Sequence, residues 1–211
     1  MAEPNFKLIH PIVMFGNGEI PHHSIPLEKL KNASTLISLD GGCDKLLNLG
    51  LNPDFIIGDL DSLKMDRAKY KGKIILMKDQ SKTDLEKGIE WLINEKIQKL
   101  ELIGCSSNRD DHHLANLLLI EKYSKIIEIK MTTNWSVIRC LNRSKTFKSI
   151  PGQVVSIIPK NNNVKITTEG LKYSLKNEML SHRSEGISNV ALGKYFSLAV
   201  SQPVWIIINH I

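Results

Sequence analysis

The sequence of 211 residues contains only three cysteines, and none of them belongs to a Cys-x-x-Cys pair or another metal-ligand spacing. Isolated thiols of this kind are typical of a reducing compartment and argue against a disulfide-rich secreted fold. No apolar run approaches the roughly 20 residues needed to cross a bilayer. The first ten residues also lack the basic-then-apolar pattern of a secretory signal. We therefore expect a soluble, cytoplasmic protein that does not bind membranes.

Two common site signatures are absent as well. The sequence has no P-loop and no Gly-x-Ser-x-Gly elbow, and "GNGEIP" over residues 16–21 is too short for a dinucleotide fingerprint. Positive charge is in excess, with a formal net charge of +6 and a pI of about 9.1. That balance suits a nucleic-acid binder or an enzyme that attracts nucleotides. Because the lysines are scattered and aromatic residues make up only 6%, we favour steering of an anionic substrate over nucleic-acid binding.

The first two thirds of the chain alternate short apolar runs with segments of helical periodicity. The helical segments include "CDKLLNLG", "TDLEKGIEWLINE" and "HHLANLLLIEKY". This alternation predicts an α/β domain with a Rossmann-like, mostly parallel sheet and crossover helices. Ligands bind such sheets beyond the carboxyl ends of the strands, so the polar clusters that follow the runs should gather at one edge. The apolar runs occupy residues 8–15, 34–39, 55–58, 73–77 and 100–104.

The pattern changes after about residue 135. Short β-branched or aromatic runs such as "QVVSIIP", "YFSLAV" and "PVWIIIN" are separated by glycine, proline, asparagine and serine, and no convincing helical pattern occurs. These features predict an antiparallel all-β domain, either a sandwich or a roll. We expect two domains, an α/β domain over residues 1–140 and a β-sandwich over residues 141–211.

The segment "PDFIIGDLDSL" over residues 53–63 ends an apolar run on two aspartates. In an extended segment, side chains two residues apart point the same way, so Asp59 and Asp61 would face one point. Like charges held close are unfavourable unless a cation lies between them, and Mg²⁺ accepts carboxylates together with water and substrate phosphates. A turn in which Gly58 permits the bend and the aspartates cap backbone amides explains the same residues. The motif alone leaves both interpretations open.

Further polar residues follow other strands of the predicted sheet. Asp40 begins an Asp-Gly-Gly segment, which suits either a ligand or a turn. Asp84 lies at a helix start, where Thr83 and Glu86 match the capping box. Local rules therefore explain Asp84 as a helix-start residue. Its functional interpretation depends on its position beside the other aspartates in the predicted strand order.

The segment "GCSSNRDDHHLANLLL" over residues 104–119 joins a strand to a helix. A glycine-bearing loop before a helix N-terminus forms a phosphate site, and Arg109 adds a permanent positive charge. Adjacent His112 and His113 face different directions on a helix, which makes a two-histidine metal site improbable.

Taken together, these motifs resemble thiamine pyrophosphokinases. "DGG", "PDFIIGDLDS", "DQSKTDLEKGIEWL" and "RDDHHLAN" occur in that family's order, and the C-terminal half is similar to its β domain. The resemblance runs from about Gly16 to the C-terminus. It implies an N-terminal nucleotide-binding domain, a C-terminal domain for thiamine binding and dimerisation, and a homodimer. It also implies Mg²⁺-dependent transfer of a pyrophosphoryl group from ATP to thiamine, with release of AMP.

The resemblance also assigns roles to residues. It implies catalytic and metal-binding roles for Asp59, Asp61 and Asp84, and thiamine contacts for Ser188 and Asn189. Two departures from the family pattern are visible, at Ser107–Asn108 before the motif arginine and at Gly186–Ile187. The positions implied to bind the nucleotide and its phosphates are Asp40, Gly41, Gly42, Gln80, Thr83, Gly104, Arg109, Asp111, His112 and Asn116.

Several alternatives remain at this level. The acceptor could be another hydroxylated heterocycle such as a pterin, or the protein could bind nucleotide or thiamine without catalysis. A nucleic-acid binder would show salt-sensitive oligonucleotide binding. The sequence does not decide which of the three aspartates accepts the proton of the attacking hydroxyl.

Overall fold

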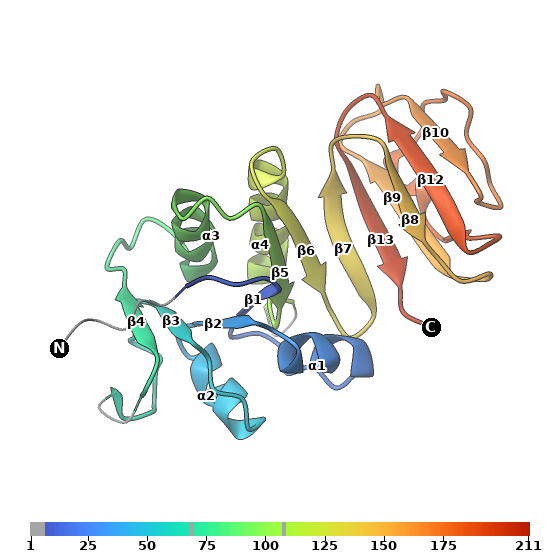
Figure 1. The fold of residues 1–211 in the computed structure, drawn as a ribbon. Helices are drawn as coiled ribbons and strands as arrows, with labels where there is room; N and C mark the ends of the chain where they lie inside the picture. Colours follow the sequence, from blue (N-terminus) through green and yellow to red (C-terminus); the bar gives the residue numbers. More distant parts are fainter. Residues whose placement is uncertain (1–6, 68–69, 107–108) are drawn as a thin grey trace. The chain divides into compact units, whose positions relative to one another are not determined.

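The computed structural model describes residues 7–67, 70–106 and 109–211, and contacts divide the chain into two compact units (Figure 1). The first unit is Met1–Asn134 and the second is Trp135–Ile211. This division lies a few residues before the boundary that we expected after residue 140. Strand β7 (Ser136–Leu141) pairs with a strand of the second unit and therefore belongs to that unit.

The first unit is the predicted α/β domain. Its strands lie in the order β6-β5-β1-β2-β3-β4, and every neighbouring pair is parallel. Strands β1, β2 and β3 are buried along their whole length, as expected of apolar runs covered on both faces. The strands are β1 (Ile12–Phe15), β2 (Thr35–Leu39), β3 (Phe55–Gly58), β4 (Lys73–Leu76), β5 (Lys99–Ile103) and β6 (Glu128–Thr132).

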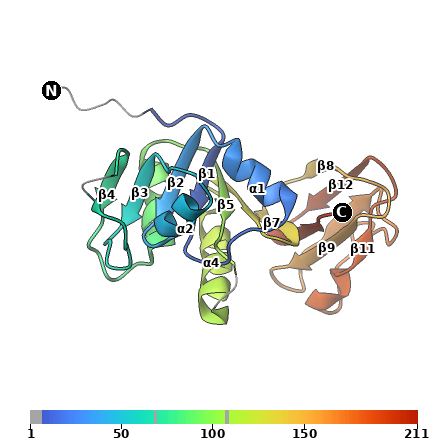
Figure 2. The ribbon, with the colours of Figure 1, turned by 90° about the horizontal axis from the view of Figure 1, so that it is seen from below.

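Two helices cover each face of this sheet. Helices α1 (Ser24–Lys31) and α2 (Gly42–Asn48) pack Leu30 and Leu46 against Phe15 of β1. Helices α3 (Asp84–Asn94) and α4 (Asp110–Tyr123) lie on the other face in Figure 1. Figure 2 shows β4, β3, β2, β1 and β5 side by side. The unit is therefore a three-layer arrangement in which every helix follows a strand end.

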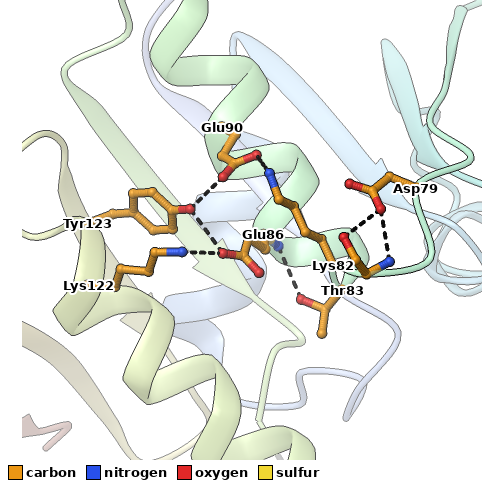
Figure 3. A network of polar contacts seen from close by, with 8 residues as sticks. Asp79, Lys82, Thr83, Glu86, Glu90, Lys122 and Tyr123 are labelled. Carbon is orange, nitrogen blue, oxygen red and sulfur yellow. Dashed lines mark hydrogen bonds and ion pairs between the residues drawn. The ribbon is translucent and has the colours of Figure 1, made fainter.

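The start of α3 follows the local rules only in part. The Thr83 hydroxyl caps the helix by accepting a hydrogen bond from the Glu86 backbone N–H over 3.2 Å. The predicted capping box also requires the Glu86 carboxylate to turn back towards Thr83. Instead it accepts hydrogen bonds from Lys122 and Tyr123 of α4, which draws it across to the neighbouring helix (Figure 3).

The second unit is an antiparallel β-sandwich, as predicted. Strands β11-β9-β13-β7 are neighbours in one sheet, and β10-β12-β8 form the other. Alternate residues such as Val155 and Ile157 of β9 face a core shared with Phe147, Phe196 and other apolar side chains. The remaining elements are β8 (Lys145–Lys148), β9 (Val154–Pro159), β10 (Ile166–Glu169), a 3-10 helix (Arg183–Gly186), β11 (Asn189–Val190), β12 (Tyr195–Val200) and β13 (Val204–Asn209).

In the described part of the chain, we find no helix with the length and apolar character that membrane crossing requires.

Candidate active site

The carboxyl ends of the parallel strands meet at one edge of the first unit, and the segments that follow them line a cavity of about 470 Å³. This is the edge at which the sequence predicted a site. The cavity has the size of a small-molecule site. The sequence-predicted residues that line it are Asp40, Asp59, Gln80, Thr83, Asp84, Gly104, Arg109, His112 and Asn116.

Three aspartates converge at this edge. Asp40, Asp59 and Asp61 each offer a carboxylate oxygen, and these oxygens lie within 4.8 Å of one another. Asp40 is only 6% exposed, and its Oδ1 atom has no hydrogen-bond partner among the described residues. Burial raises the pKa of Asp40, and the charge of Asp84 raises it further. A buried carboxylate oxygen without a donor is unfavourable, so the arrangement suits a cation held between the three acids.

The two aspartates after β3 converge for a reason that differs from our expectation. The segment is not extended at this point, because Leu60 adopts a left-handed backbone conformation with φ of 67°. Its side chain is buried beside Cys43 and Ile56. A left-handed residue of this kind costs about 1–2 kcal/mol, and burying a leucine gives about 1.5–3 kcal/mol. The turn is thus held by the leucine between the aspartates, and Asp61 donates its backbone N–H to Asp59 over 3.3 Å.

Asp84 faces the same cavity from the start of α3. A Cβ atom on Gly58 would lie 3.1 Å from Cβ of Asp40 and 3.4 Å from Oδ1 of Asp84, and Gly58 has a φ of 151°. Glycine is therefore needed there both for its backbone conformation and for the close approach of these two acids. Asp84 lies outside the three-acid group defined in the described residues, and its Oδ1 atom accepts a hydrogen bond from Lys87 over 3.0 Å.

The N-terminus of α4 supplies the positive side of the cavity. Arg109 precedes the helix and donates two hydrogen bonds to Asp111, at 3.1 Å and 2.6 Å. Hydrogen bonding by Arg109 is the main cause that lowers the pKa of Asp111 to about 2. Asp111 does not line the cavity itself, and it acts on the guanidinium that does. Asn116 donates to the Cys105 carbonyl over 2.8 Å and so ties α4 to the loop after β5.

The glycines of the Asp-Gly-Gly segment serve the backbone. Gly41 and Gly42 do not line the cavity. A Cβ atom on Gly42 would lie 2.7 Å from the Gly16 carbonyl, so this glycine lets α2 begin directly against the loop after β1. Lys45 of α2 then donates to the carbonyls of Asn17 and Gly18 over 2.6 Å and 2.7 Å.

Both units match models of one family. Residues 27–131 match the model described as "Thiamin pyrophosphokinase, catalytic domain", and residues 141–205 match "Thiamin pyrophosphokinase, vitamin B1 binding domain". The chain belongs to the thiamin pyrophosphokinase family. Its two units therefore coincide with the two regions that the family models distinguish.

Two curated relatives are similar in sequence. Thiamine pyrophosphokinase from Bacillus subtilis (strain 168) is 25% identical over 150 residues, which cover 67% of this chain and 70% of the relative. Thiamin pyrophosphokinase 1 from Caenorhabditis elegans is 28% identical over 111 residues, 48% of this chain and 46% of that protein. The match thus spans about half the length of the nematode relative.

Solved thiamin pyrophosphokinase structures share the fold. The Bacillus subtilis enzyme has a TM-score of 0.78 at 24% identity, with 94% of this chain and 97% of that chain covered. The Geobacillus thermodenitrificans structure has a TM-score of 0.80 at 24% identity and covers 95% and 97%. Yeast thiamin pyrophosphokinase has a TM-score of 0.76 at 17% identity and covers 96% and 88%. At these identities the likeness establishes the architecture of both units.

The two predicted thiamine contacts of this family member lie in the second unit. Ser188 is exposed, has a φ of 59°, and donates its backbone N–H to Ser156 over 3.0 Å. Asn189 is only 6% exposed, and its amide exchanges hydrogen bonds with the backbone of Tyr173. Asn189 therefore holds the segment around Tyr173 in place, and thiamine contact by either residue remains a prediction.

Sequence reasoning missed some residues of this thiamin pyrophosphokinase cavity. Asn17 and Gly18 line it from the loop after β1, where "GNG" was a usable signal that lacked a recognised spacing. His113 lines it too, and its Nδ1 atom is buried without a partner among the described residues. Lys87 gave no signal, since lysine in an amphipathic helix is ordinarily exposed. Ser107 and Asn108, where the sequence departs from the family pattern, lie outside the described residues.

Proposed function

We propose that this protein transfers the terminal pyrophosphoryl group of ATP to the hydroxyl of thiamine, giving thiamine diphosphate and AMP. One observation carries the proposal: carboxylate oxygens of Asp40, Asp59 and Asp61 lie within 4.8 Å of one another at the strand ends of a chain whose two units match both thiamin pyrophosphokinase models. A cluster of acids suits a polyphosphate only when a divalent cation is present.

The residues present fit Mg²⁺. Three carboxylates offer the hard oxygen ligands that Mg²⁺ prefers, and the buried Oδ1 atom of Asp40 lacks any other partner in the described residues. We therefore propose Asp40, Asp59 and Asp61 as its ligands. When bound, Mg²⁺ would supply the charge neutralisation that the transferred phosphates require. Asp40 thus takes a metal-binding role besides the nucleotide contact implied by the resemblance.

Other groups of the chain act on the remaining charge. Arg109 lines the cavity, and its hydrogen bonds to Asp111 hold the guanidinium in one orientation. The N-terminus of the 14-residue helix α4 follows directly. Backbone N–H groups and the helix dipole favour a phosphate there, and an arginine adds a charge that is never lost. These groups would orient the triphosphate and stabilise the departing AMP.

In the proposed reaction the thiamine oxygen attacks the β-phosphorus of ATP. A bond forms between that oxygen and the β-phosphorus, the bond from the β-phosphorus to the AMP oxygen breaks, and the hydroxyl proton passes to a carboxylate. We propose Asp84 as the acceptor. It lines the cavity but stands outside the three-acid group, and an aspartate that binds a metal is a poor base. Its alternative assignment as a metal ligand is tested below.

Thiamine binding is assigned to the second unit, with Ser188 and Asn189 as the proposed contacts. The match of residues 141–205 to a vitamin B1 binding model supports this division. Thiamine is a cation, so an acid-rich edge suits it electrostatically. We further propose that the protein acts as a cytoplasmic homodimer, as the family resemblance implies.

Product analysis tests the function. The protein is incubated with ATP, Mg²⁺ and thiamine, and we expect AMP and thiamine diphosphate in equal amounts. A non-catalytic binder would bind both substrates and form neither product. A pterin that competes out thiamine as the better acceptor would support the alternative substrate.

Matched variants test the assignments. Asp61→Asn should weaken Mg²⁺ binding and lower turnover, whereas Asp84→Asn should lower turnover and weaken Mg²⁺ binding much less than Asp61→Asn does. Asp66→Asn removes an exposed acid nearby and serves as the control. Near-normal turnover of Asp61→Asn at saturating Mg²⁺ would reject the metal assignment, and a loss of Mg²⁺ binding in Asp84→Asn as large as that in Asp61→Asn would make Asp84 a ligand.

A further inference from the structure

Lys87 is buried at the wall of the cavity. Its side chain is only 4% exposed, and Asp40 and Lys87 are the charged residues of the described chain that are buried. Burying an ammonium group is costly unless it is well paired. Lys87 also lies in the first turn of α3, where the positive end of the helix dipole disfavours a cation. Two separate physical costs thus fall on one side chain.

The protein compensates these costs only in part. The ammonium group has three hydrogens, and in the described residues it has one hydrogen-bond partner, Asp84, at 3.0 Å. Its field reaches other acids of the edge. The pKa of Asp59 is lowered mainly by the hydrogen bond from Gln80, and the charge of Lys87 contributes to the same shift. The Lys87 side chain lines the cavity, so its other N–H groups can donate hydrogen bonds to a ligand there.

Pairing with Asp84 does not explain the burial. An ion pair three residues apart on a helix stabilises by about 0.2–0.5 kcal/mol, and it forms equally well on the surface. By contrast, a cation fixed between the acids and the cavity would attract a polyphosphate and offset its repulsion by the neighbouring carboxylates. It attracts the anion without requiring a further metal ion.

We propose that Lys87 binds the polyphosphate of the nucleotide as a fixed cation of the protein, while it remains bonded to Asp84. This proposal rests on the proposed function, because that function makes the anion a nucleotide triphosphate. It gives Lys87 a substrate-binding role that is separate from the metal-binding acids. A distinctive consequence follows for Lys87→Met. Loss of the cation makes the site more negative, so nucleotide affinity falls while Mg²⁺ affinity stays the same or rises.

Titration calorimetry tests this with Mg²⁺ alone and with the α,β-methylene analogue of ATP at saturating Mg²⁺. For Lys87→Met we expect analogue binding to weaken by about tenfold or more, as for a lost charge-assisted hydrogen bond. Lys87→Arg keeps the charge and should bind the analogue more tightly than Lys87→Met. The matched control is Lys122→Met, which removes an exposed lysine of α4 that pairs with Glu86 away from the cavity.

The outcomes separate the possible roles. Unchanged analogue affinity in Lys87→Met overturns the proposal, and if turnover still falls, Lys87 only positions Asp84. Equal analogue affinities of the methionine and arginine variants also overturn it, because the nucleotide then does not respond to charge at this position. If wild-type protein forms no thiamine diphosphate, the proposed function fails, whereas these binding titrations still decide whether Lys87 contacts the nucleotide.

Folding of the variants is checked by circular dichroism. The ion-pair partner Asp84 is 29% exposed, so Lys87→Met does not leave that carboxylate buried and unpaired, and the variant should fold. Should it fail, the double variant Asp84→Asn with Lys87→Met removes both charges of the pair. The double variant is compared with Asp84→Asn alone. The proposal requires the double variant to bind the analogue more weakly, and equal affinities would overturn it.

Discussion

The side-chain amide of Gln80 donates a hydrogen bond to Oδ2 of Asp59 over 2.7 Å. This bond joins the segment after β4 to the acidic turn after β3. It is also the main cause of the lowered pKa of Asp59. Gln80 thus acts on the candidate metal site through Asp59, since its hydrogen bond lowers the pKa of that carboxylate and orients it.

We therefore expect Gln80→Leu to weaken Mg²⁺ binding by about three- to tenfold, somewhat less than is typical when a residue that hydrogen-bonds a metal ligand is removed. Mg²⁺ titration of activity should show a higher requirement for the metal, with turnover at saturating Mg²⁺ reduced much less. Gln98→Leu, at an exposed glutamine before β5, is the control. An unchanged Mg²⁺ requirement would mean that the hydrogen bond does not orient Asp59.

Asp44 of α2 holds the segment that follows the acidic pair. Its two carboxylate oxygens accept hydrogen bonds from the backbone N–H groups of Lys64 and Met65, over 2.9 Å and 3.1 Å. Asp44→Ala should lower the free energy of unfolding by about 1–2 kcal/mol, because both donors lose a charged acceptor. Urea unfolding measures this loss. A lower free energy of unfolding without weaker Mg²⁺ binding would show that the two hydrogen bonds of Asp44 stabilise the fold and do not shape the site.

Periodicity was sufficient to predict the fold. Strands β1, β2 and β3 are buried on both faces, which is why they appear as unbroken apolar runs, and β9 alternates because one face of the sandwich is exposed. The edge that gathers the polar residues followed from the parallel order. Boundaries were less certain, since "LIHPIVMF" contributes only Ile12–Phe15 to a strand.

The lining of the cavity was predictable where chemistry and chain position coincide, as at Asp59 and Asp84. It was not predictable where tertiary packing decides. The left-handed turn at Leu60 depends on a buried pocket around Cys43, which no local pattern encodes. Burial of Lys87 likewise depends on the sheet below α3, and the bonds of Asn189 to Tyr173 depend on a segment 16 residues away. Such relationships arise from the folded arrangement alone.

Gly58 provides a test of the geometry between Asp40 and Asp84. An alanine there would meet Cβ of Asp40 at 3.1 Å on a backbone with φ of 151°. Gly58→Ala should lower the free energy of unfolding by about 1–3 kcal/mol and strongly reduce Mg²⁺ binding. Gly193→Ala is the control, because its φ is ordinary and, in the described part of the chain, no atom beyond Gly193 and its two chain neighbours lies within 4 Å of the added Cβ. Wild-type Mg²⁺ affinity in Gly58→Ala would show that the acids tolerate displacement.

Tyr123 links the two helices that cover one face of the sheet. Its hydroxyl lies 3.0 Å from Oε1 of Glu86 and 2.8 Å from Oε1 of Glu90, and Glu90 also pairs with the cavity-lining Lys82 over 2.6 Å (Figure 3). Burial, followed by the hydrogen bond to Glu90, raises the pKa of Tyr123 to about 12. The phenol therefore remains neutral in the folded protein where an unfolded tyrosine already ionises.

This shift makes the stability contribution of Tyr123 dependent on pH. It is fully present below the ordinary tyrosine pKa of 10.0 and is lost as the pH rises through the folded value of about 12. Tyr123→Phe should lower the free energy of unfolding by about 1.5–3 kcal/mol at pH near 8, as expected for a hydrogen bond to a charged acceptor. The difference from wild type should shrink towards pH 12, measured by urea unfolding together with phenolate absorbance. Tyr195→Phe, which removes the hydroxyl of a tyrosine that is 58% exposed, is the control variant. A constant difference between wild type and Tyr123→Phe across this range would show that the phenol contributes packing and no hydrogen bond to the carboxylates.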